Sequence, residues 1–287
     1  MSGETILARD LHPRYTIESG QPLTFYADYN PEISIITYPV GNTAVEARFK
    51  QGLSSTSISA RRSDGKSAVG EIMSRFRLGD DIESMYDSIK TDRKISTAIE
   101  KYRGMRITKN DPWETTICFI VSQFNNLKRI RKIIKGMMVS FGEEIEGFGG
   151  ETIHTFPSAE ALADARLEEI IKCGTGFRGK YIKSAAEYCS KNIELGSLSK
   201  LGYTELKEEL LLIDGVGDKV ADCIALMGYG KLEAFPIDVW VKRSMELMYF
   251  KGEKRSIKDI HAYADKKWGS LAGFAQQYIF WYGRGTF

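Results

Sequence analysis

The chain has 287 residues, of which 43% are hydrophobic and 27% are charged. This composition is typical of a folded globular protein. Its 40 basic and 38 acidic residues leave a formal net charge of only +2, which argues against indiscriminate coating of nucleic acid but allows a local basic face. No apolar run is long enough to cross a bilayer, and the N-terminus has no apolar core of signal-peptide length. We therefore expect an intracellular protein (cytoplasm, nucleoid or nucleus) without a membrane partner.

The cysteines and histidines are too scattered to suggest a metal centre. The four cysteines form no C-x-x-C pair, and the three histidines form no H-x-E or HExxH arrangement. Zinc ribbons and iron–sulfur clusters need closely spaced ligands. We therefore expect no metal and no cofactor, and we look for chemistry carried by side chains alone.

The first 75 residues favour an antiparallel sheet. The runs Leu23–Ala27, Ile33–Tyr38 and Val45–Phe49 are β-branched or aromatic, or alternate apolar with polar residues, and Gly, Pro, Asn and Ser separate them. These are the signals of short strands joined by turns. We predict an N-terminal β domain with linking helices over residues 1–100.

From Asp80 onward the signals become helical. Capping residues open helices at Asp80-Asp81, at Thr91-Asp92 and at Asp111-Pro112. Amphipathic stretches with short connectors predict further helices near Thr115–Phe124, Lys128–Phe141, Ser158–Cys173, Lys180–Asn192, Tyr203–Ile213, Lys219–Met227, Val239–Met248, Ile257–Lys267 and Leu271–Tyr282. The predicted class is α+β, with the β domain followed by a helical domain over residues 101–287.

The turn between two of these helices is the most informative segment. Gly215, Val216 and Gly217 lie between a helix that ends at Ile213 and one that begins near Lys219. Glycines allow a tight turn with outward-pointing backbone N–H groups, and such groups beside a helix N-terminus can bind a phosphate oxygen. An ordinary glycine-containing turn between helices remains an alternative for these residues.

Lys219 and Asp238 together suggest chemistry at this turn. A lysine in the first turn of a helix is near the positive end of the helix dipole, which favours the neutral amine that can attack a sugar carbon. Asp238 follows a proline at the start of another predicted helix, where a carboxylate could stabilise positive charge on a sugar ring. Simple helix capping by Asp238 is an equally valid interpretation at this point.

These segments carry a resemblance to a known family. The stretch I-D-G-V-G-D-K-V-A-D-C at 213–223, followed by P-I-D-V at 236–239, resembles the helix-hairpin-helix and Gly/Pro-Asp (HhH-GPD) signature of base-excision DNA glycosylases. It is most similar to the 8-oxoguanine DNA glycosylases that have an N-terminal β domain. S-G-Q at 19–21, N-D-P at 110–112, N-N-L-K-R-I at 125–130 and G-T-G-F-R-G-K-Y at 174–181 resemble further motifs of that family, in the same order.

The resemblance implies an activity and its catalytic residues. It implies a bifunctional DNA glycosylase/AP lyase that excises 8-oxoguanine from double-stranded DNA, acting as a monomer. Lys219 would attack C1′ of a flipped nucleotide and form a Schiff base, which then undergoes β-elimination. Asp238 would support the charged transition state.

The resemblance also implies a base pocket. Cys223 is four residues after Lys219 and so shares its helix face, where it could stack on a purine or be a buried structural thiol. Gln276 would read the Watson–Crick edge, although Gln277 beside it leaves the register open. Phe280 would stack on the other side of the base, or belong to the core. Gly20 would offer its carbonyl to the N7–H of the lesion, or merely serve a turn.

A further group would contact the DNA around the flipped nucleotide. By resemblance it comprises the hairpin residues together with Asn126, Arg129, Arg178, Phe124 and Phe177. Arg129 and Arg178 would contact the orphaned partner base. Three positions depart from the family: Phe124 replaces the asparagine that fills the gap, Phe177 replaces a wedge tyrosine, and Trp240 replaces a histidine. We therefore expect lesion recognition with a looser preference for cytosine opposite.

Two other functions remain open from the residues. An alkyl-purine glycosylase of the same superfamily would use Asp238 with water and an aromatic cleft, but Lys219 and the small Cys223 count against it. A non-catalytic hairpin module would use Lys219 only to bind phosphate. A pure phosphate binder has no need of Asp238 behind a fixed proline.

Overall fold

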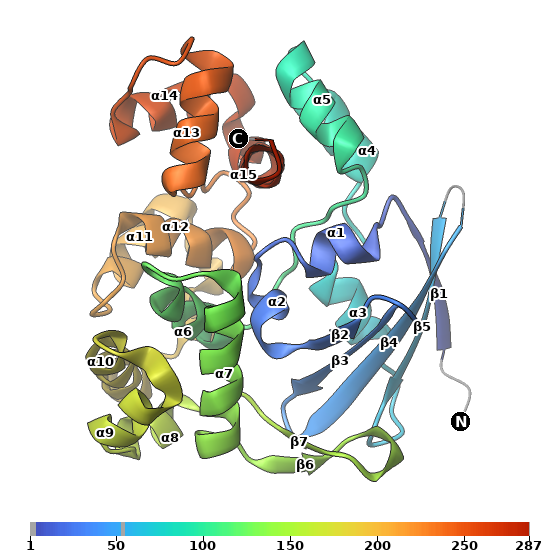
Figure 1. Cartoon of the computed structure of the whole chain (residues 1–287), viewed down its shortest axis with the longest axis vertical. Helices are drawn as coiled ribbons and strands as arrows, with labels where there is room; N and C mark the ends of the chain where they lie inside the picture. Colours follow the sequence, from blue (N-terminus) through green and yellow to red (C-terminus); the bar gives the residue numbers. More distant parts are fainter. Residues whose placement is uncertain (1–3, 53–54, 287) are drawn as a thin grey trace.

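A five-stranded antiparallel sheet begins the computed structural model, which describes residues 4–52 and 55–286 (Figure 1). The strand order is β1 (Glu4–Arg9), β5 (Ser55–Arg62), β4 (Thr43–Gln51), β3 (Ile35–Val40) and β2 (Asp28–Asn30). Alternate residues of β5 are buried, as expected of a sheet with one face on a core. Helix α3 (Val69–Arg75) packs on β1 and β5, so the inner face is covered by the chain that follows the sheet.

The predicted strand at Leu23–Ala27 is wrong, because this segment forms the short helix α2 (Pro22–Tyr26), preceded by α1 (Pro13–Ile17). Pro22 occupies the first turn, where its fixed φ favours a helix. Leu23, Phe25 and Tyr26 are all buried. A short apolar run does not distinguish a buried strand from a buried helical turn.

The remainder of the chain is mainly helical, which confirms the predicted class. After α4 (Ile82–Ile89) and α5 (Arg93–Lys101) come α6 (Pro112–Ser122), α7 (Leu127–Phe141), α8 (Ala159–Asp164), α9 (Leu167–Ile170), α10 (Arg178–Asn192), α11 (Tyr203–Leu211), α12 (Asp218–Met227), α13 (Val239–Tyr249), α14 (Ile257–Trp268) and α15 (Ala272–Arg284). No helix within residues 4–52 and 55–286 is long and apolar enough to cross a membrane.

Two predicted helices differ from the observed ones. The single helix predicted over Ser158–Cys173 is split into α8 and α9, because Ala165 is extended and Glu169 caps a new helix start at Arg166. Helix α6 ends at Ser122 and does not reach Phe124, which has a left-handed backbone with φ of +49°. The end of α6 lies beside the candidate site, since Ser122 and Asn125 line its cavity.

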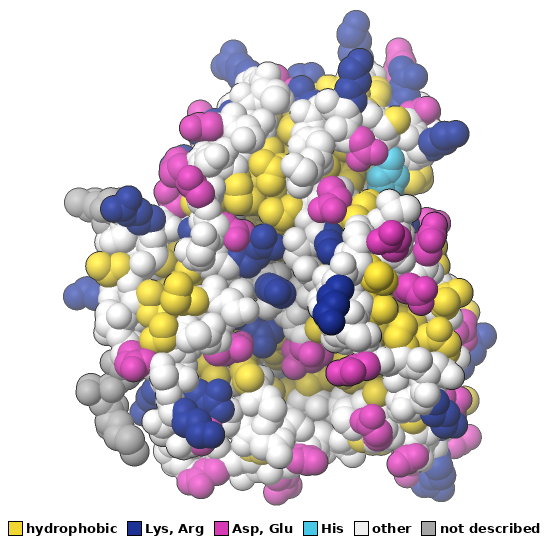
Figure 2. Space-filling model, turned by 180° about the vertical axis from the view of Figure 1, so that it is seen from behind, with side chains coloured by type: hydrophobic (Ala, Val, Ile, Leu, Met, Phe, Trp, Pro, Cys, Tyr) yellow, Lys and Arg dark blue, Asp and Glu magenta, His cyan; other side chains and the backbone are white. Residues whose placement is uncertain are grey.

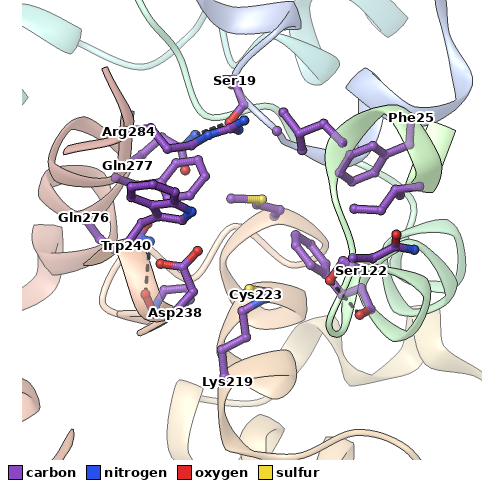
Figure 3. A pocket seen from close by; sticks show the side chains of 18 of the residues that line it. Ser19, Phe25, Ser122, Lys219, Cys223, Asp238, Trp240, Gln276, Gln277 and Arg284 are labelled. Atoms are coloured by element: carbon purple, nitrogen blue, oxygen red, sulfur yellow. Dashed lines mark hydrogen bonds between the residues drawn. The ribbon is translucent and has the colours of Figure 1, made fainter. Parts of the chain in front are cut away.

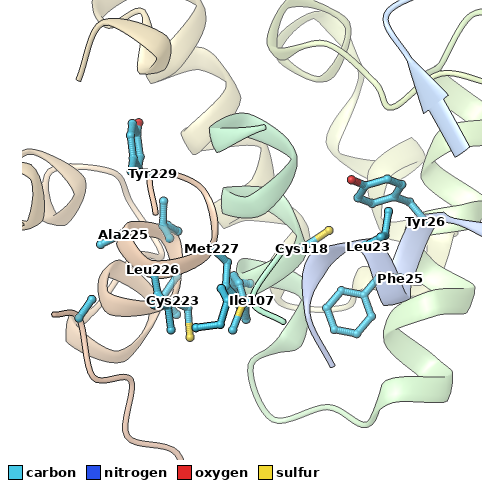
Figure 4. Close-up of a cluster of buried hydrophobic side chains, with 14 of the residues drawn as sticks. Leu23, Phe25, Tyr26, Ile107, Cys118, Cys223, Ala225, Leu226, Met227 and Tyr229 are labelled. Carbon is cyan, nitrogen blue, oxygen red and sulfur yellow. The ribbon is translucent and has the colours of Figure 1, made fainter. Parts of the chain in front are cut away.

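The sheet and the helices share one continuous core. Buried side chains of α2 lie close to Cys118 of α6, and those of α12 lie on the other side of α6 (Figure 4). A small hairpin, β6 (Glu144–Glu146) and β7 (Thr152–His154), returns from the helical part to contact β4. The domain boundary near residue 100 therefore stays a prediction.

Candidate active site

One cavity of about 290 Å³ brings together residues from five parts of the chain (Figure 3). Its walls come from α2 and the turn before it, from α6 and α7 with their connection, from α12, from the start of α13, and from α15. All the residues predicted for catalysis and for the base pocket line it, and one predicted DNA contact does so too: Lys219, Asp238, Gly20, Cys223, Gln276, Phe280 and Asn126.

The hairpin between α11 and α12 places Lys219 at the edge of this cavity. Gly215 has φ of +85°, and a Cβ atom there would lie 2.7 Å from Cβ of Tyr181. Only glycine satisfies both conditions. Gly217 then caps α12 with extended backbone, so Lys219 lies in the first turn. Its Nζ is 5.3 Å from the centre of the Phe119 ring, and the side chain is half-buried.

Asp238 is a helix cap and a pocket residue at once. It is the N-cap of α13, and its Oδ1 accepts a hydrogen bond of 2.7 Å from the backbone N–H of Val241. The carboxylate is half-buried and lines the cavity. Capping uses one of the two carboxylate oxygens, so the capping and catalytic interpretations are compatible. The cap fixes the side chain at the wall of the cavity.

Cys223 lies one turn along α12 from Lys219, facing the same cavity (Figure 3). Burial raises the pKa of its thiol to about 11, although the neighbouring Lys219 acts in the opposite direction. The sulfur is therefore a neutral, polarisable surface at ordinary pH and not a thiolate nucleophile. Such a surface suits stacking against a flat ring.

The two adjacent glutamines of α15 have different partners. Gln276 donates a hydrogen bond of 3.0 Å to the carbonyl of Pro236, and its buried Oε1 has no hydrogen-bond partner among the described residues. Gln277 donates to the carbonyl of Ser19, at 3.2 Å. A buried acceptor without a partner is costly unless a ligand satisfies it. Gln276 is therefore the better candidate to read a base, and Gln277 ties α15 to the turn at Gly20.

Gly20 and Phe280 meet on the opposite side of the cavity. Gly20 has φ of +80°, and a Cβ atom built there would be 3.6 Å from the Phe280 ring. Phe280 is half-buried, one turn beyond Gln276 on α15. The glycine backbone and the aromatic ring thus lie side by side in the cavity wall. We call the part of the cavity lined by Gly20, Phe280 and Cys223 the slot.

Two aromatic side chains predicted to contact DNA, Phe124 and Phe177, stand outside the cavity on the protein surface. We call them the aromatic pair. Phe124 is 92% exposed and Phe177 is 54% exposed. Arg129 and Asn126 are also exposed, and Asn126 caps α7 by accepting from the N–H of Arg129. Both rings are associated with Arg178, which lies 4.5 Å from the Phe177 ring centre and binds the Phe124 carbonyl, so they belong to one surface region and not to scattered positions.

Arg178 does not share this exposure. It is 3% exposed, and its guanidinium donates to the backbone carbonyls of Gln123, Phe124 and Thr175. The predicted contact between Arg178 and an orphaned base therefore has little support from its position, and that contact stays a prediction. Arg129, by contrast, is free to reach a ligand.

Several cavity residues were not predicted as pocket residues: Phe25, Phe119, Trp240 and Arg284. Phe25 fell in the segment misassigned as a strand, and Phe119 belongs to an apolar helix whose periodicity gives no sign of a site. Arg284 lies over the rings of Phe280 and Trp281 at 5.9 and 5.7 Å. Among these four positions, only Trp240, which replaces the histidine of the family motif, carried a signal in the sequence.

Charge is mixed on the face turned away from the viewer in Figure 1. Several Lys and Arg side chains gather near the middle of that face, and acidic side chains are scattered around them (Figure 2). This distribution agrees with the net charge of +2. A local basic area within a nearly neutral protein suits selective binding of a polyanion.

The hairpin, the lysine at its end and the slot for a planar ligand define a helix-hairpin-helix protein with a base-sized pocket. Residues 117–270 match the family described as "HhH-GPD superfamily base excision DNA repair protein", and residues 5–116 match "8-oxoguanine DNA glycosylase, N-terminal domain". The chain belongs to the HhH-GPD superfamily, in the branch that carries the N-terminal domain of the 8-oxoguanine DNA glycosylases.

Similar proteins support this assignment. A probable N-glycosylase/DNA lyase of Methanothermobacter thermautotrophicus is 31% identical over 229 residues, which cover 73% of this chain and 72% of that protein. The structure of MBOgg1 with a low-affinity DNA ligand has a TM-score of 0.87 at 34% identity, covering 99% and 98% of the two chains. The 8-oxoguanine glycosylase/lyase of Clostridium acetobutylicum, bound to DNA with cytosine opposite 8-oxoguanine, has a TM-score of 0.86 at 27% identity and 99% coverage of both chains.

Proposed function

We propose that this protein is a bifunctional DNA glycosylase/AP lyase that excises 8-oxoguanine from double-stranded DNA in base excision repair, acting as a monomer. The observation that carries the proposal is that one cavity, formed by a single chain, contains Lys219, Cys223, Asp238 and Gln276. An amine, a carboxylate and a base-reading amide are the groups that the reaction needs. The relatives named N-glycosylase/DNA lyase and 8-oxoguanine glycosylase/lyase support the same activity.

The reaction begins when the Lys219 amine attacks C1′ of the flipped nucleotide. The C1′–N9 bond breaks, and the purine leaves with the bonding electrons and acquires a proton. Loss of a proton from nitrogen and opening of the sugar ring give a Schiff base between Lys219 and C1′. Removal of a C2′ proton then expels the 3′ phosphate by β-elimination. Asp238 stabilises the positive charge that develops on the sugar.

The slot determines which base is accepted. Cys223 and Phe280 offer flat apolar surfaces for stacking, from α12 and from α15. The unpartnered Oε1 of Gln276 accepts a hydrogen bond from the Watson–Crick edge of the purine. The Gly20 carbonyl accepts from N7–H, a donor that guanine lacks. A base without that donor leaves the carbonyl unsatisfied, which is a strong basis for discrimination.

Recognition of the opposite base is looser in this proposal. The aromatic pair stacks on bases without regard to their hydrogen-bonding groups. Burial lowers the pKa of the Arg178 guanidinium, and Arg129 is an exposed cation close enough to act in the same direction. Arg129 supplies the remaining preference for cytosine. Replacing Phe124 by Asn restores an amide at this position and should sharpen the preference for cytosine several-fold, whereas Arg129→Ala should weaken it. If Arg129→Ala left the preference unchanged, the role given to Arg129 would be wrong.

The experiment is a glycosylase assay on duplexes with 8-oxoguanine opposite each of the four bases, with and without alkali, followed by borohydride trapping. We expect base release, strand nicking without alkali, and a trapped covalent adduct. If the protein were instead an alkyl-purine glycosylase that uses water, it would release methylated purines and form no adduct. A purely binding module predicts salt-sensitive affinity without release of any base.

A further inference from the structure

The aromatic pair is organised around one buried guanidinium. Cζ of Arg178 lies 4.5 Å from the centre of the Phe177 ring, and Nη2 donates a hydrogen bond of 3.0 Å to the carbonyl of Phe124. Nε donates to the carbonyl of Gln123 at 2.7 Å. Arg178 therefore contacts the ring of Phe177 and the backbone of Phe124, although its own side chain is almost inaccessible to solvent.

Phe124 needs such a partner. Its φ of +49° places a bulky residue in the left-handed region, which L side chains with a Cβ rarely adopt. Its ring is nearly fully exposed, so packing against the core does not hold the conformation. Hydrogen bonds hold the residues on either side of Phe124, from Asn125 to the Val121 carbonyl and from Gln123 to the Gly215 carbonyl. Arg178 is the side chain that binds the carbonyl of Phe124 itself, together with that of residue 123.

Arginine suits this position better than other donors. Its planar fork can donate to several carbonyls at once, which an ammonium cannot do in a fixed geometry. Burial lowers the pKa of Arg178, and the neighbouring Arg129 acts in the same direction. A charge in this environment depends on its carbonyl partners, so the guanidinium and the loop stabilise each other.

The same loop is joined to the catalytic hairpin. The side-chain amide of Gln123 donates to the carbonyl of Gly215 at 2.9 Å, while the Gln123 carbonyl accepts from Arg178. A short chain of hydrogen bonds therefore links the Phe124 loop to the turn that precedes Lys219. Displacement of one segment would strain the other.

We propose that Arg178 is a positioning residue that holds Phe124 in its left-handed conformation and Phe177 beside it, so that the aromatic pair is ready to enter the duplex. Phe124 takes the place of the flipped nucleotide by stacking, and the link to the hairpin keeps Lys219 aligned. This inference rests on the proposed function, since it assumes a duplex with a flipped base. It differs from a direct DNA contact, because the guanidinium donors are already bound to carbonyls.

The test uses 2-aminopurine placed beside 8-oxoguanine, whose fluorescence rises when the stack opens. Measurements are made on the full chain carrying Lys219→Gln, so that the base is retained. We expect Arg178→Ala and Phe124→Gly each to lower the fluorescence amplitude in the Lys219→Gln background. With Lys219 present, each substitution should slow single-turnover excision about tenfold or more. A restraint on a left-handed residue is of the size that changes a rate by about tenfold. In the Phe124→Gly background, Arg178→Ala should cause a clearly smaller further loss than it does in the Phe124 protein, and the remainder reflects Phe177 and the link to the hairpin.

The salt dependence separates positioning from a contact with phosphate. Loss of an arginine that binds phosphate reduces the slope of log affinity against log salt by about one. For Arg178→Ala we expect an unchanged slope. Arg178→Lys should recover only part of the fluorescence change, because a lysine cannot bridge the same carbonyls. Thermal unfolding of each variant shows whether the fold is kept. If Arg178→Ala does not fold, Phe124→Gly still tests the proposal.

Two matched controls are available. Arg61 stacks on Phe148 with Cζ 4.3 Å from the ring centre, and Leu7 is a 72% exposed apolar residue on the edge strand β1. Arg61→Ala and Leu7→Ala should leave both readouts unchanged. Additive losses for Arg178→Ala and Phe124→Gly, or a reduced salt slope, would overturn the inference even when the wild-type protein excises 8-oxoguanine. Absence of excision by the wild-type protein would instead refute the proposed function.

Discussion

The cavity and the aromatic pair differ in how their side chains are held. Lys219, Asp238 and Gln276 lie on regular helices, and their positions follow from local features such as a cap or a helix start. Phe124 has a left-handed backbone and Phe177 stands at the start of α10, and both contact Arg178, which bonds to carbonyls of another segment. Rigid helices suit groups that must meet a reacting atom, whereas a restrained loop suits groups that must enter a deformable duplex.

The largest predicted effect concerns the cavity. Asp238→Asn preserves helix capping, because asparagine caps as well as aspartate does, but it removes the negative charge. We expect single-turnover excision of 8-oxoguanine to fall by about 100-fold or more, with thermal stability nearly unchanged. A variant with nearly normal excision would show that Asp238 serves only as a cap, and the contrast between the two regions would weaken.

A smaller effect is predicted for the glutamines of α15. Gln276→Leu removes the unpartnered acceptor in the slot and should raise KM for the lesion about tenfold or more, since a hydrogen bond to a base is lost. It also breaks the bond to the Pro236 carbonyl, so a loss of stability of about 1 kcal/mol should accompany the change in KM. Gln277→Leu breaks the bond to the Ser19 carbonyl and should mainly reduce stability, by about 1 kcal/mol. Steady-state kinetics and thermal unfolding of both variants test this. The reverse pattern would mean that Gln277 reads the base.

The last prediction concerns stability and expects no change in excision by the folded protein; it is made at Glu114, on the helix that leads to Phe124. Burial raises the pKa of Glu114 to about 7, against the opposing influence of Arg75 at 3.8 Å. Arg75 is already paired with Glu71 at 2.9 Å, which limits that influence. The folded state therefore holds a proton that the unfolded chain releases near pH 4.5, so the contribution to stability is complete below that pH and is lost as the pH rises to about 7.

The measurement is the free energy of unfolding between pH 4.5 and 7 for the wild type and Glu114→Gln. The wild type should lose up to about 3 kcal/mol more than the variant over this range. Glu144→Gln, on the exposed strand β6, removes one charge without burial and is the matched control. Equal pH dependence of the wild type and Glu114→Gln would contradict the assignment.

The sequence predicted the cavity better than the surface around it. The spacing of Lys219 and Cys223 places both on one helix face, and a proline followed by Asp238 marks a helix start, so local rules suffice. The sheet and most helices follow from the same kind of pattern. The errors at Leu23–Ala27 and Ser158–Cys173 arose where tertiary contacts or a second cap override local propensity.

The arrangement around Arg178 could not be predicted in this way. Arg178 and Phe124 are 54 positions apart, and neither residue type signals that one will bind the carbonyl of the other. The motif suggested an arginine on the DNA, whereas the structure buries it beneath the aromatic pair. The role of Phe119 could not be predicted either, because only the packing of α6 on α12 brings its ring to Lys219.

The most direct test of the account is to trap the enzyme on 8-oxoguanine duplex with borohydride, digest the adduct and identify the modified peptide by mass spectrometry. We predict a single adduct on Lys219, absent on undamaged duplex and absent in Lys219→Gln. An adduct on a different lysine, or base release by Lys219→Gln at the wild-type rate, would contradict the claim that Lys219 is the nucleophile.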